Sequence, residues 1–397
     1  MAEWLRQPIA RRSALTLGAG ALASSPLWAQ SLVDLGFSQG DGRRPLTDAF
    51  PGKRGMILQR VRAPLLETPM AAFDGELGAS TFTPNDRFFV RWHYADIPLS
   101  VDVDSFRLQV GGAVKHPLSL SLKQLQSLPQ VEIAAVNQCS GNSRGAFGPR
   151  VAGAQWGNGA IGNALWTGVR LRDLLERAGV APGAVQVQFA GLDRPPGDAP
   201  WFAKSLAIDH ARADEVIVAY GMNGAQLPLL NGFPLRLIVP GWFSTYWVKA
   251  LDRITVLAAP DTGYWMDKAY RIPATPRANV VPGAKDFPTV PIGRMLPRAF
   301  FTRADVGAVR GIALGGAAGV AKVDWSIDGG KSWHPAQLGP DAGRYGFRRW
   351  AASVPPGAQT VAVRTTNTNG ETQRFDPIWN PGGYMRNSIE TMKVTRA

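Results

Sequence analysis

The only cysteine of the chain, Cys139, is the residue whose surroundings most restrict its chemistry. A cysteine can be a buried apolar residue, a nucleophile or, as a thiolate, a metal ligand. Cys139 follows the segment 131–138, which is predicted to be a strand, and precedes the turn-rich segment 140–145. This order predicts a side chain that points into a cleft from a strand end. Arg144 places positive charge beside the sulfur and favours the thiolate. Because no neighbouring histidine offers a base, the pattern favours a metal ligand over a nucleophile, with a buried thiol as the alternative.

Arg236 is the second residue with a restricted environment. It stands in the apolar run FPLRLIV, where an unpaired charge is costly, so the sequence predicts a buried anionic partner such as a phosphate. Three other polar residues have plain structural alternatives. Lys249 could be a surface lysine, Tyr270 a tyrosine bonded to the backbone, and Asp193 a turn residue. The aromatic cluster in 242–247 is expected in the core or in a pocket wall.

The histidine and cysteine content argues against other metal centres. The four histidines are far apart in the sequence and form no pair at helical spacing, so zinc is not predicted. One cysteine provides no intrachain disulfide, no Cys-x-x-Cys-His haem attachment and no iron–sulfur cluster. Electrons produced in a redox reaction would therefore have to leave to a separate protein.

Composition and charge are those of a globular protein with an anionic ligand or partner. The chain has 397 residues, 45% hydrophobic and 18% charged, which is enough for two domains. No run approaches the roughly 20 apolar residues that span a bilayer. The net charge of +13 suggests nucleic acid, anionic lipid, an acidic partner or an anionic substrate. The arginines are scattered, without any run of five basic residues, which favours a small-anion pocket and an acidic partner over nucleic acid.

The first 29 residues have the order of a cleavable export signal. Basic residues, including the pair Arg11-Arg12, precede a short apolar run from Ala14 to Ala23, and small residues follow up to Ala29. The paired arginines resemble a twin-arginine signal, which exports proteins that have already folded around a cofactor. A general secretory signal is the alternative. Either signal predicts a periplasmic protein and argues further against a nucleic-acid partner.

The remaining chain is predicted to form two domains. Residues 45–271 mix strands with a few helices, such as 171–178, and indicate an α+β domain. The proline-rich segment 272–297 is typical of a linker. Short alternating strands are then predicted at 321–327, 344–350 and 361–364, so residues 285–397 are expected to form an all-β sandwich.

Several motifs in order resemble the sulfite oxidase family of molybdenum enzymes. The longest is VNQCSGNSRGAFGPRVAGAQWGNGAIGNALWTGVRLRDLLERAGV at 136–180, similar to the family's molybdenum-binding segment. FFVRWH at 88–93 precedes it, and GLD at 191–193, the segment 218–251 and DKAYRIP at 267–273 follow it. The resemblance runs from about residue 45 to the end. It implies an α+β molybdenum-cofactor domain followed by an immunoglobulin-like domain that mediates dimers.

The resemblance implies a role for each matching residue. Cys139 corresponds to the thiolate that binds molybdenum. The remaining substrate-pocket residues, implied to line the oxyanion pocket or to contact the metal's oxo group, are Arg91, Arg144, Trp156 and Tyr270. Those implied to hold the molybdopterin and its phosphate are His93, Asp193, Asn231, Arg236 and Lys249, with Asn231 in place of the family's usual histidine. The family's Asn-x-Arg-Gly is Asn-Pro-Gly-Gly at 380–383, so a third pocket arginine is missing unless Arg386 reaches in.

The function implied is oxidation of sulfite to sulfate, with electrons passed to a c-type cytochrome on a separate chain. Arginine suits a sulfur oxyanion because its rigid fork of donors stays charged. The protein would be a homodimer or a heterodimer with the cytochrome. Alternatives are a sulfane dehydrogenase of a sulfur-oxidising complex, a sulfoxide reductase, against which the C-terminal sandwich counts, and a non-catalytic exported anion-binding protein.

Overall fold

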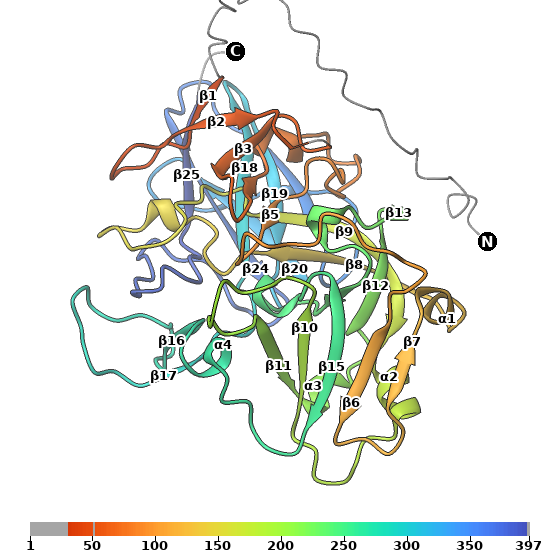
Figure 1. Cartoon of the computed structure of the whole chain (residues 1–397). Coiled ribbons are helices and arrows are strands. Elements are labelled where there is room, and N and C mark those ends of the chain that lie inside the picture. The colour runs from red at the N-terminus through yellow and green to blue at the C-terminus, as the bar shows by residue number, and fades with distance from the viewer. Residues whose placement is uncertain (1–30, 51, 395–397) are drawn as a thin grey trace, which may run out of the picture.

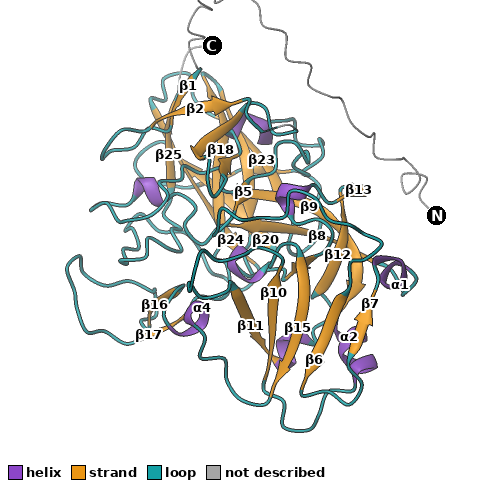
Figure 2. Cartoon of the chain, in the orientation of Figure 1, coloured by secondary structure: helices purple, strands orange, loops and turns teal. Residues whose placement is uncertain are grey.

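The computed structural model describes residues 31–50 and 52–394, so the predicted export signal at 1–29 lies outside the described residues. The described chain is mostly β-sheet with few, short helices (Figure 2). Its α-helices are α1 Leu122–Gln126, α2 Leu171–Ala178, α3 Ile208–Ala211 and α4 Tyr264–Asp267. The predicted helix 171–178 is confirmed as α2, which buries its leucines and ends at Gly179 with a left-handed φ of 67°.

The N-terminal strands form an antiparallel sheet that ends at the sequence-predicted pocket arginine Arg91. Its strands, in spatial order, are β1 Leu32–Asp34, β2 Arg43–Thr47, β3 Met56–Arg60, β4 Leu65–Glu67 and β5 Val90–Arg91. In such a sheet, residues that are directly opposite each other on neighbouring strands have their side chains close together.

Two further sheets form the body of the molecule in the lower part of Figure 1. One contains β11 Ala203–Ala207, β10 Gln186–Gly191, β15 Leu251–Leu257, β6 Leu108–Gly112 and β7 Leu118–Leu120, with β15 and β6 parallel. The other contains β13 Ala225–Gln226, β12 Ile217–Met222, β9 Ile161–Arg170 and β8 Val131–Gln138, with β14 Arg236–Ile238 paired to β12. In this second sheet, β8 leads directly into Cys139 and β14 carries Arg236.

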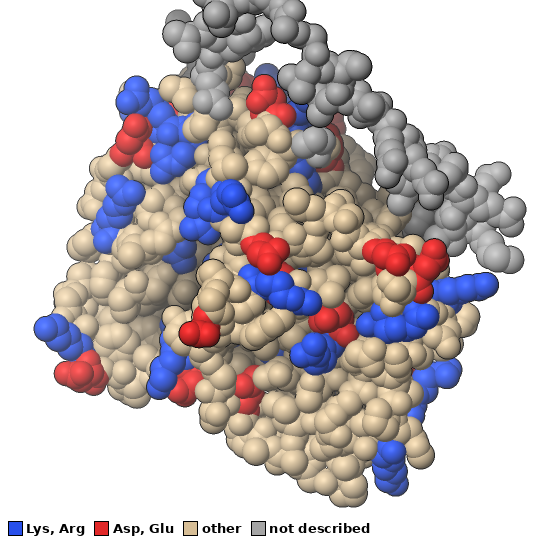
Figure 3. Space-filling view, viewed as in Figure 1, with Lys and Arg blue, Asp and Glu red and all other residues tan. Residues whose placement is uncertain are grey.

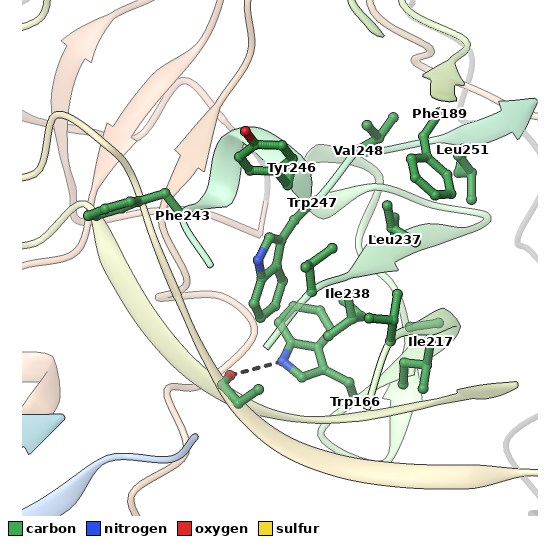
Figure 4. Close-up of a cluster of buried hydrophobic side chains, with 14 of the residues drawn as sticks. Trp166, Phe189, Ile217, Leu237, Ile238, Phe243, Tyr246, Trp247, Val248 and Leu251 are labelled. Carbon is green, nitrogen blue, oxygen red and sulfur yellow. Dashed lines mark hydrogen bonds between the residues drawn. The ribbon is translucent and has the colours of Figure 1, made fainter. Parts of the chain in front are cut away.

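A large apolar core supports β8 and β14. Trp166 on β9 and Trp247 pack edge to face at 5.7 Å, among Ile217, Leu237 and Ile238 (Figure 4). The indole of Trp166 donates to the carbonyl of Ala135 on β8 at 3.0 Å, the dashed line in Figure 4. Strands β8 and β9 are therefore joined by a side-chain hydrogen bond in the core as well as by their ladder.

The C-terminal strands form two four-stranded sheets around one apolar core. One sheet has β18 Arg298–Asp305, β19 Ala308–Leu314, β23 Arg348–Ser353 and β22 Gln337–Leu338. The other has β21 His334–Pro335, β20 Val320–Ser326, β24 Thr360–Asn367 and β25 Glu390–Lys393. Side chains of both, such as Phe301, Val323 and Trp350, share a core, as expected of a sandwich. The division of the chain at 45–271 and 285–397 stays a prediction.

The segment 272–297 is more ordered than a plain linker. Strand β16 Arg271–Pro273 pairs antiparallel with β17 Thr289–Pro291, and the connecting loop projects at the left of Figure 1. The proline content suggested a linker, but proline is tolerated at the ends of strands and on edge strands, so it does not exclude this two-stranded ribbon.

Charges are dispersed on the face shown in Figure 3, where lysines and arginines lie among acidic and uncharged residues. Within the part of the chain that is described, no helix is long and apolar enough to cross a membrane.

The C-terminal sandwich is attached to the N-terminal segment through Arg349 on β23. Its guanidinium donates to the carbonyls of Phe73, Ala79 and Ser80 at 2.6–3.1 Å.

We predict that Arg349→Met lowers the free energy of unfolding by about 3 kcal/mol, because it leaves three carbonyls without their charged donor. Denaturant titration measures this. Arg303→Met, at an exposed position of the same sandwich, should change the value by less than about 1 kcal/mol. If the two variants lower the free energy of unfolding equally, the three hydrogen bonds of Arg349 do not stabilise the attachment of the sandwich.

Candidate active site

Cys139 is presented by the end of a fully paired strand. All eight residues of β8 pair with β9, from Val131 opposite Gly168 to Gln138 opposite Ile161. The Cys139 amide then donates to the Ala160 carbonyl at 2.9 Å. The next turn closes at once, because the Asn142 amide donates back to the Cys139 carbonyl at 3.0 Å. The thiol is 6% exposed.

Two cavities meet at this cysteine. An inner cavity of about 440 Å³ and an outer pocket of about 760 Å³ share three lining residues, Arg91, Cys139 and Tyr270. The sulfur is therefore buried, as a small hydrophobe would be, and also borders open space on two sides. That position suits a ligand of a metal held between a cofactor and a substrate.

The inner cavity is lined by cations and unpaired donors. Arg91, Arg236 and Lys249 contribute positive charge, and none of the described lining residues is a carboxylate. Several buried lining atoms lack a hydrogen-bond partner among the described residues: Arg91 Nη1, Asn137 Nδ2, Ser140 Oγ, Arg236 Nε and Thr245 Oγ1. Buried polar groups are rarely left unsatisfied. These residues thus fit a polar anionic group such as the phosphate of a molybdopterin.

Arg236 and Lys249 are held in place by aromatic rings and carbonyls. The Arg236 guanidinium lies over the rings of Trp166 and Trp247, at 5.3 and 5.9 Å, and donates to the backbone carbonyl of Asn231 at 2.9 Å. Lys249 Nζ lies 4.5 Å from the Trp92 ring centroid. Burial lowers the pKa of Arg236 to about 9. Burial, followed by the charge of Arg236, lowers the pKa of Lys249 to about 7. An anion beside them would favour the charged forms and raise both pKa values.

The outer pocket contains the predicted substrate arginines. Arg144, 8% exposed, donates from Nε and Nη2 to the Gly382 carbonyl and from Nη1 to Ala154, at 3.0–3.2 Å. Trp156 forms a buried part of the wall. Its loop is fixed by the buried carboxylate of Glu67, which accepts from the amides of Gly157 and Gly159 at 3.0 and 2.9 Å.

Tyr270 and His93 form a hydrogen-bonded pair beside the sulfur. The distance from Tyr270 Oη to His93 Nε2 is 2.6 Å. Burial raises the pKa of Tyr270, so the phenol keeps its proton. Burial, then the charge of Arg91, holds the pKa of His93 well below its usual value. With both groups neutral, the phenol can donate to the imidazole.

The turn that carries Arg144 is also held by the C-terminal sandwich. Ser143 has a left-handed φ of 65°, and its Oγ accepts from both terminal nitrogens of Arg298 at 3.0 Å. Arg298 on β18 is itself paired with Glu390 at 2.6 Å. The pocket arginine is thus positioned from two sides.

The structure does not bring every predicted residue to the cavities. Asn231 lies behind Arg236 and donates to the Phe89 carbonyl at 3.1 Å, without lining either cavity. Asp193 also lies outside both linings, although its charge acts on Lys249. Arg386 does not supply the third pocket arginine, because it donates to Glu390 at 2.7 Å and lines a different cavity.

Sequence reasoning missed other residues of the site. Ser244, Thr245 and Phe202 line the inner cavity. Arg60 and Tyr384 line the outer pocket. Ser244 and Thr245 end the run PGWFST, inside the segment 218–251 that resembles the family, and this run was a usable signal for them. Arg60 gave none, since it looks like any arginine at a strand end.

Comparison with known proteins identifies the family. Residues 94–265 match the family described as oxidoreductase molybdopterin binding domain. The chain is 31% identical to sulfite oxidase of Arabidopsis thaliana, over 79% of this chain and 88% of that protein. It is 35% identical to sulfite oxidase of Gallus gallus, over 78% of this chain and 72% of that protein. The chain belongs to the sulfite oxidase family.

As a member of the sulfite oxidase family, the chain is a molybdenum oxidoreductase that binds the molybdopterin cofactor. The idea of a non-catalytic anion-binding protein is thereby set aside. The fold also resembles the crystal structure of the sulfane dehydrogenase SoxCD from Paracoccus pantotrophus, with a TM-score of 0.71, 22% identity and coverage of 95% of this chain and 92% of that chain. Within the described residues, no group of three or more His, Cys, Asp or Glu side chains could hold a metal ion.

A buried lysine beside Tyr270 is expected to make the stability of the protein depend on pH. Lys204 Nζ is 5.6 Å from the Tyr270 ring centroid and donates to the Trp265 carbonyl at 2.6 Å. Burial lowers the pKa of Lys204 to about 7, whereas an unfolded lysine has a pKa of about 10.4. Between these values only the unfolded state holds the proton, so this lysine makes the fold more stable as pH rises.

We predict that Lys204→Met reduces the pH dependence of stability above pH 7. The wild-type free energy of unfolding should contain a contribution of up to about 1.4 kcal/mol per pH unit from this residue, and the variant should lack it. Urea titrations from about pH 7 to 8.5 measure the slope. The exposed Lys115→Met variant should keep the wild-type slope; a Lys204→Met slope equal to it would contradict the assignment.

Proposed function

We propose that this protein is an exported sulfite dehydrogenase that oxidises sulfite to sulfate and passes the electrons to a separate c-type cytochrome. The observation that carries the proposal is that Cys139, Arg91 and Tyr270 line both cavities at once, one suited to an anionic cofactor and the other to a small oxyanion. The sulfite oxidases of Arabidopsis thaliana and Gallus gallus support this substrate.

The cofactor, when bound, supplies two-electron oxygen-atom transfer chemistry. The residues predicted to hold it are Cys139 at the metal and Arg236, Lys249 and His93 around the pterin and phosphate. Asp193 and Asn231, which were predicted in the same role, would act through Lys249 and Arg236.

Arg91 and Arg144 bind and orient the substrate. Sulfite has three acceptor oxygens and up to two negative charges, and arginine offers donors in a fixed fork. Three of the five N–H groups of Arg144 are used by carbonyls of the described chain, which leaves two for substrate. Each charge-assisted contact would contribute about 1.5–3 kcal/mol.

Tyr270 holds a proton beside the reacting atoms. Its raised pKa keeps Oη–H intact, and the hydrogen bond to His93 Nε2 gives that proton an acceptor. Trp156, in the wall of the outer pocket, excludes water from one side of the substrate.

The proposal includes a periplasmic location and a partner protein that accepts the electrons. The twin-arginine-like leader supports a periplasmic enzyme. A c-type cytochrome on a separate chain is supported by the single cysteine, which cannot attach such a haem, and by the resemblance to SoxCD. The C-terminal sandwich would be an immunoglobulin-like module that joins two copies or holds the cytochrome subunit.

A sulfane dehydrogenase is the second candidate function. It is favoured by the similarity of fold to SoxCD over 95% of this chain. Cytochrome c reduction with sulfite, thiosulfate or protein-bound sulfane sulfur separates the two. Reduction by sulfite supports the first function, and reduction by sulfane sulfur alone supports the second.

We predict that Cys139→Ser abolishes sulfite oxidation but leaves a folded protein that contains the pterin, because the remaining cofactor contacts are intact. Turnover with cytochrome c and the fluorescence of the extracted pterin measure the two properties. Near-normal turnover would contradict the role of the thiolate.

We predict that Arg144→Gln raises the KM for sulfite at least about tenfold, with a smaller change in kcat, because it removes charge-assisted binding. Steady-state kinetics measure both constants. Arg150→Gln, an exposed change outside the outer pocket, is the matched control. If both variants have the wild-type KM, Arg144 does not contact the substrate.

A further inference from the structure

The outer pocket has a third arginine that the proposed mechanism does not use. Arg60 lines this pocket together with Arg91 and Arg144, and the described lining contains no carboxylate to balance them. Three guanidinium groups around one space repel each other, and the repulsion is relieved when an anion lies between them.

Sheet register places Arg60 close to Arg91, across strand β4. Arg60, at the end of β3, is opposite Leu65 of β4, and Leu65 is opposite Arg91 of β5. A bulge between Leu58 and Arg60 sets this register, and the two arginines flank Leu65 across three strands, where both line the outer pocket. Leu65 itself lines the outer pocket.

Arg60 is exposed to solvent at the edge of the outer pocket. Its Nε donates to the Ala63 carbonyl at 3.2 Å, which fixes the guanidinium at its base. Burial, followed by the charge of Arg91, lowers the pKa of Arg60 from its usual value. Both effects are expected of a cation that is partly desolvated beside a like charge.

We propose that Arg60 is a substrate-binding residue at the mouth of the outer pocket, which captures sulfur oxyanions and delivers them to Arg91 and Arg144. This inference rests on the proposed function, since it takes the substrate to be an oxyanion. Arg60 contacts the anion on entry with its terminal nitrogens, and its charge adds to the field that draws anions inward.

Arg62 provides a matched control. It is an exposed arginine two residues along the chain and lines none of the pockets described above. Removing it takes the same charge from the same region of the surface without changing the outer pocket. The comparison separates a local contact from a change in net charge.

The test uses the cofactor-loaded enzyme as wild type, Arg60→Gln, Arg60→Lys and Arg62→Gln. The kcat/KM for sulfite is measured with cytochrome c at increasing ionic strength. The Kd of sulfate, an oxyanion that is not oxidised, is measured by calorimetry. At low salt, Arg60→Gln should lower kcat/KM about five- to tenfold, with kcat nearly unchanged, and weaken sulfate binding similarly. Its salt dependence should be smaller, because the screened charge is gone.

Arg60→Lys should recover the salt dependence but only part of the affinity, because it keeps the charge without the fork. Arg62→Gln should stay within about twofold of wild type. If Arg60→Gln matches Arg62→Gln in both kcat/KM and sulfate Kd while the wild type oxidises sulfite, the role of Arg60 is refuted and the proposed function stands. If the wild type does not oxidise sulfite but Arg60→Gln selectively weakens sulfate binding, the role of Arg60 stands and the proposed function fails.

Discussion

The whole site depends on how strand β8 ends. Its eight residues are paired with β9 without a break, and the indole of Trp166 fastens β8 to the core from a second direction. A strand held this firmly can present one side chain, Cys139, at a fixed point between two cavities. Had the strand frayed, the thiol could have neither a defined metal geometry nor a fixed distance to the arginines.

Both cavities are built on the same electrostatic principle, which is a lining with several positive charges and no carboxylate. In the inner cavity, Arg236 and Lys249 rest on aromatic faces, and burial lowers the pKa of both groups. In the outer pocket, Arg144 is satisfied partly by carbonyls of Gly382 and Ala154. Such arrangements are costly when empty and favourable when an anion is present. The stability of the site and its ligand preference therefore have one origin.

Local patterns were sufficient to predict part of this arrangement. The strand before Cys139, helix α2 and the sandwich strand β20 follow from apolar periodicity, and the burial of Arg236 beside an anion site follows from the cost of an unpaired charge in an apolar run. The family resemblance supplied the remaining residue roles, and the family itself is confirmed by the sulfite oxidase relatives.

Contacts between distant segments could not be predicted in this way. Arg60 reaches the pocket because it pairs with Leu65, which in turn pairs with Arg91. The sequence of a single strand does not determine how it pairs with its neighbours. Ser143 is fixed by Arg298, which follows it by 155 residues. Asn231 was expected at the phosphate, yet it hydrogen-bonds to the backbone behind Arg236, because an amide can satisfy a carbonyl there.

The central claim is that a molybdenum ion is bound by Cys139 where the two cavities meet. Anomalous diffraction at the molybdenum absorption edge, from crystals of the cofactor-loaded protein, tests it most directly. The account predicts one metal peak per chain at bonding distance from Cys139 Sγ, beside Arg91 and Tyr270. A peak elsewhere in the molecule, or a metal with no bond to this sulfur, would contradict it.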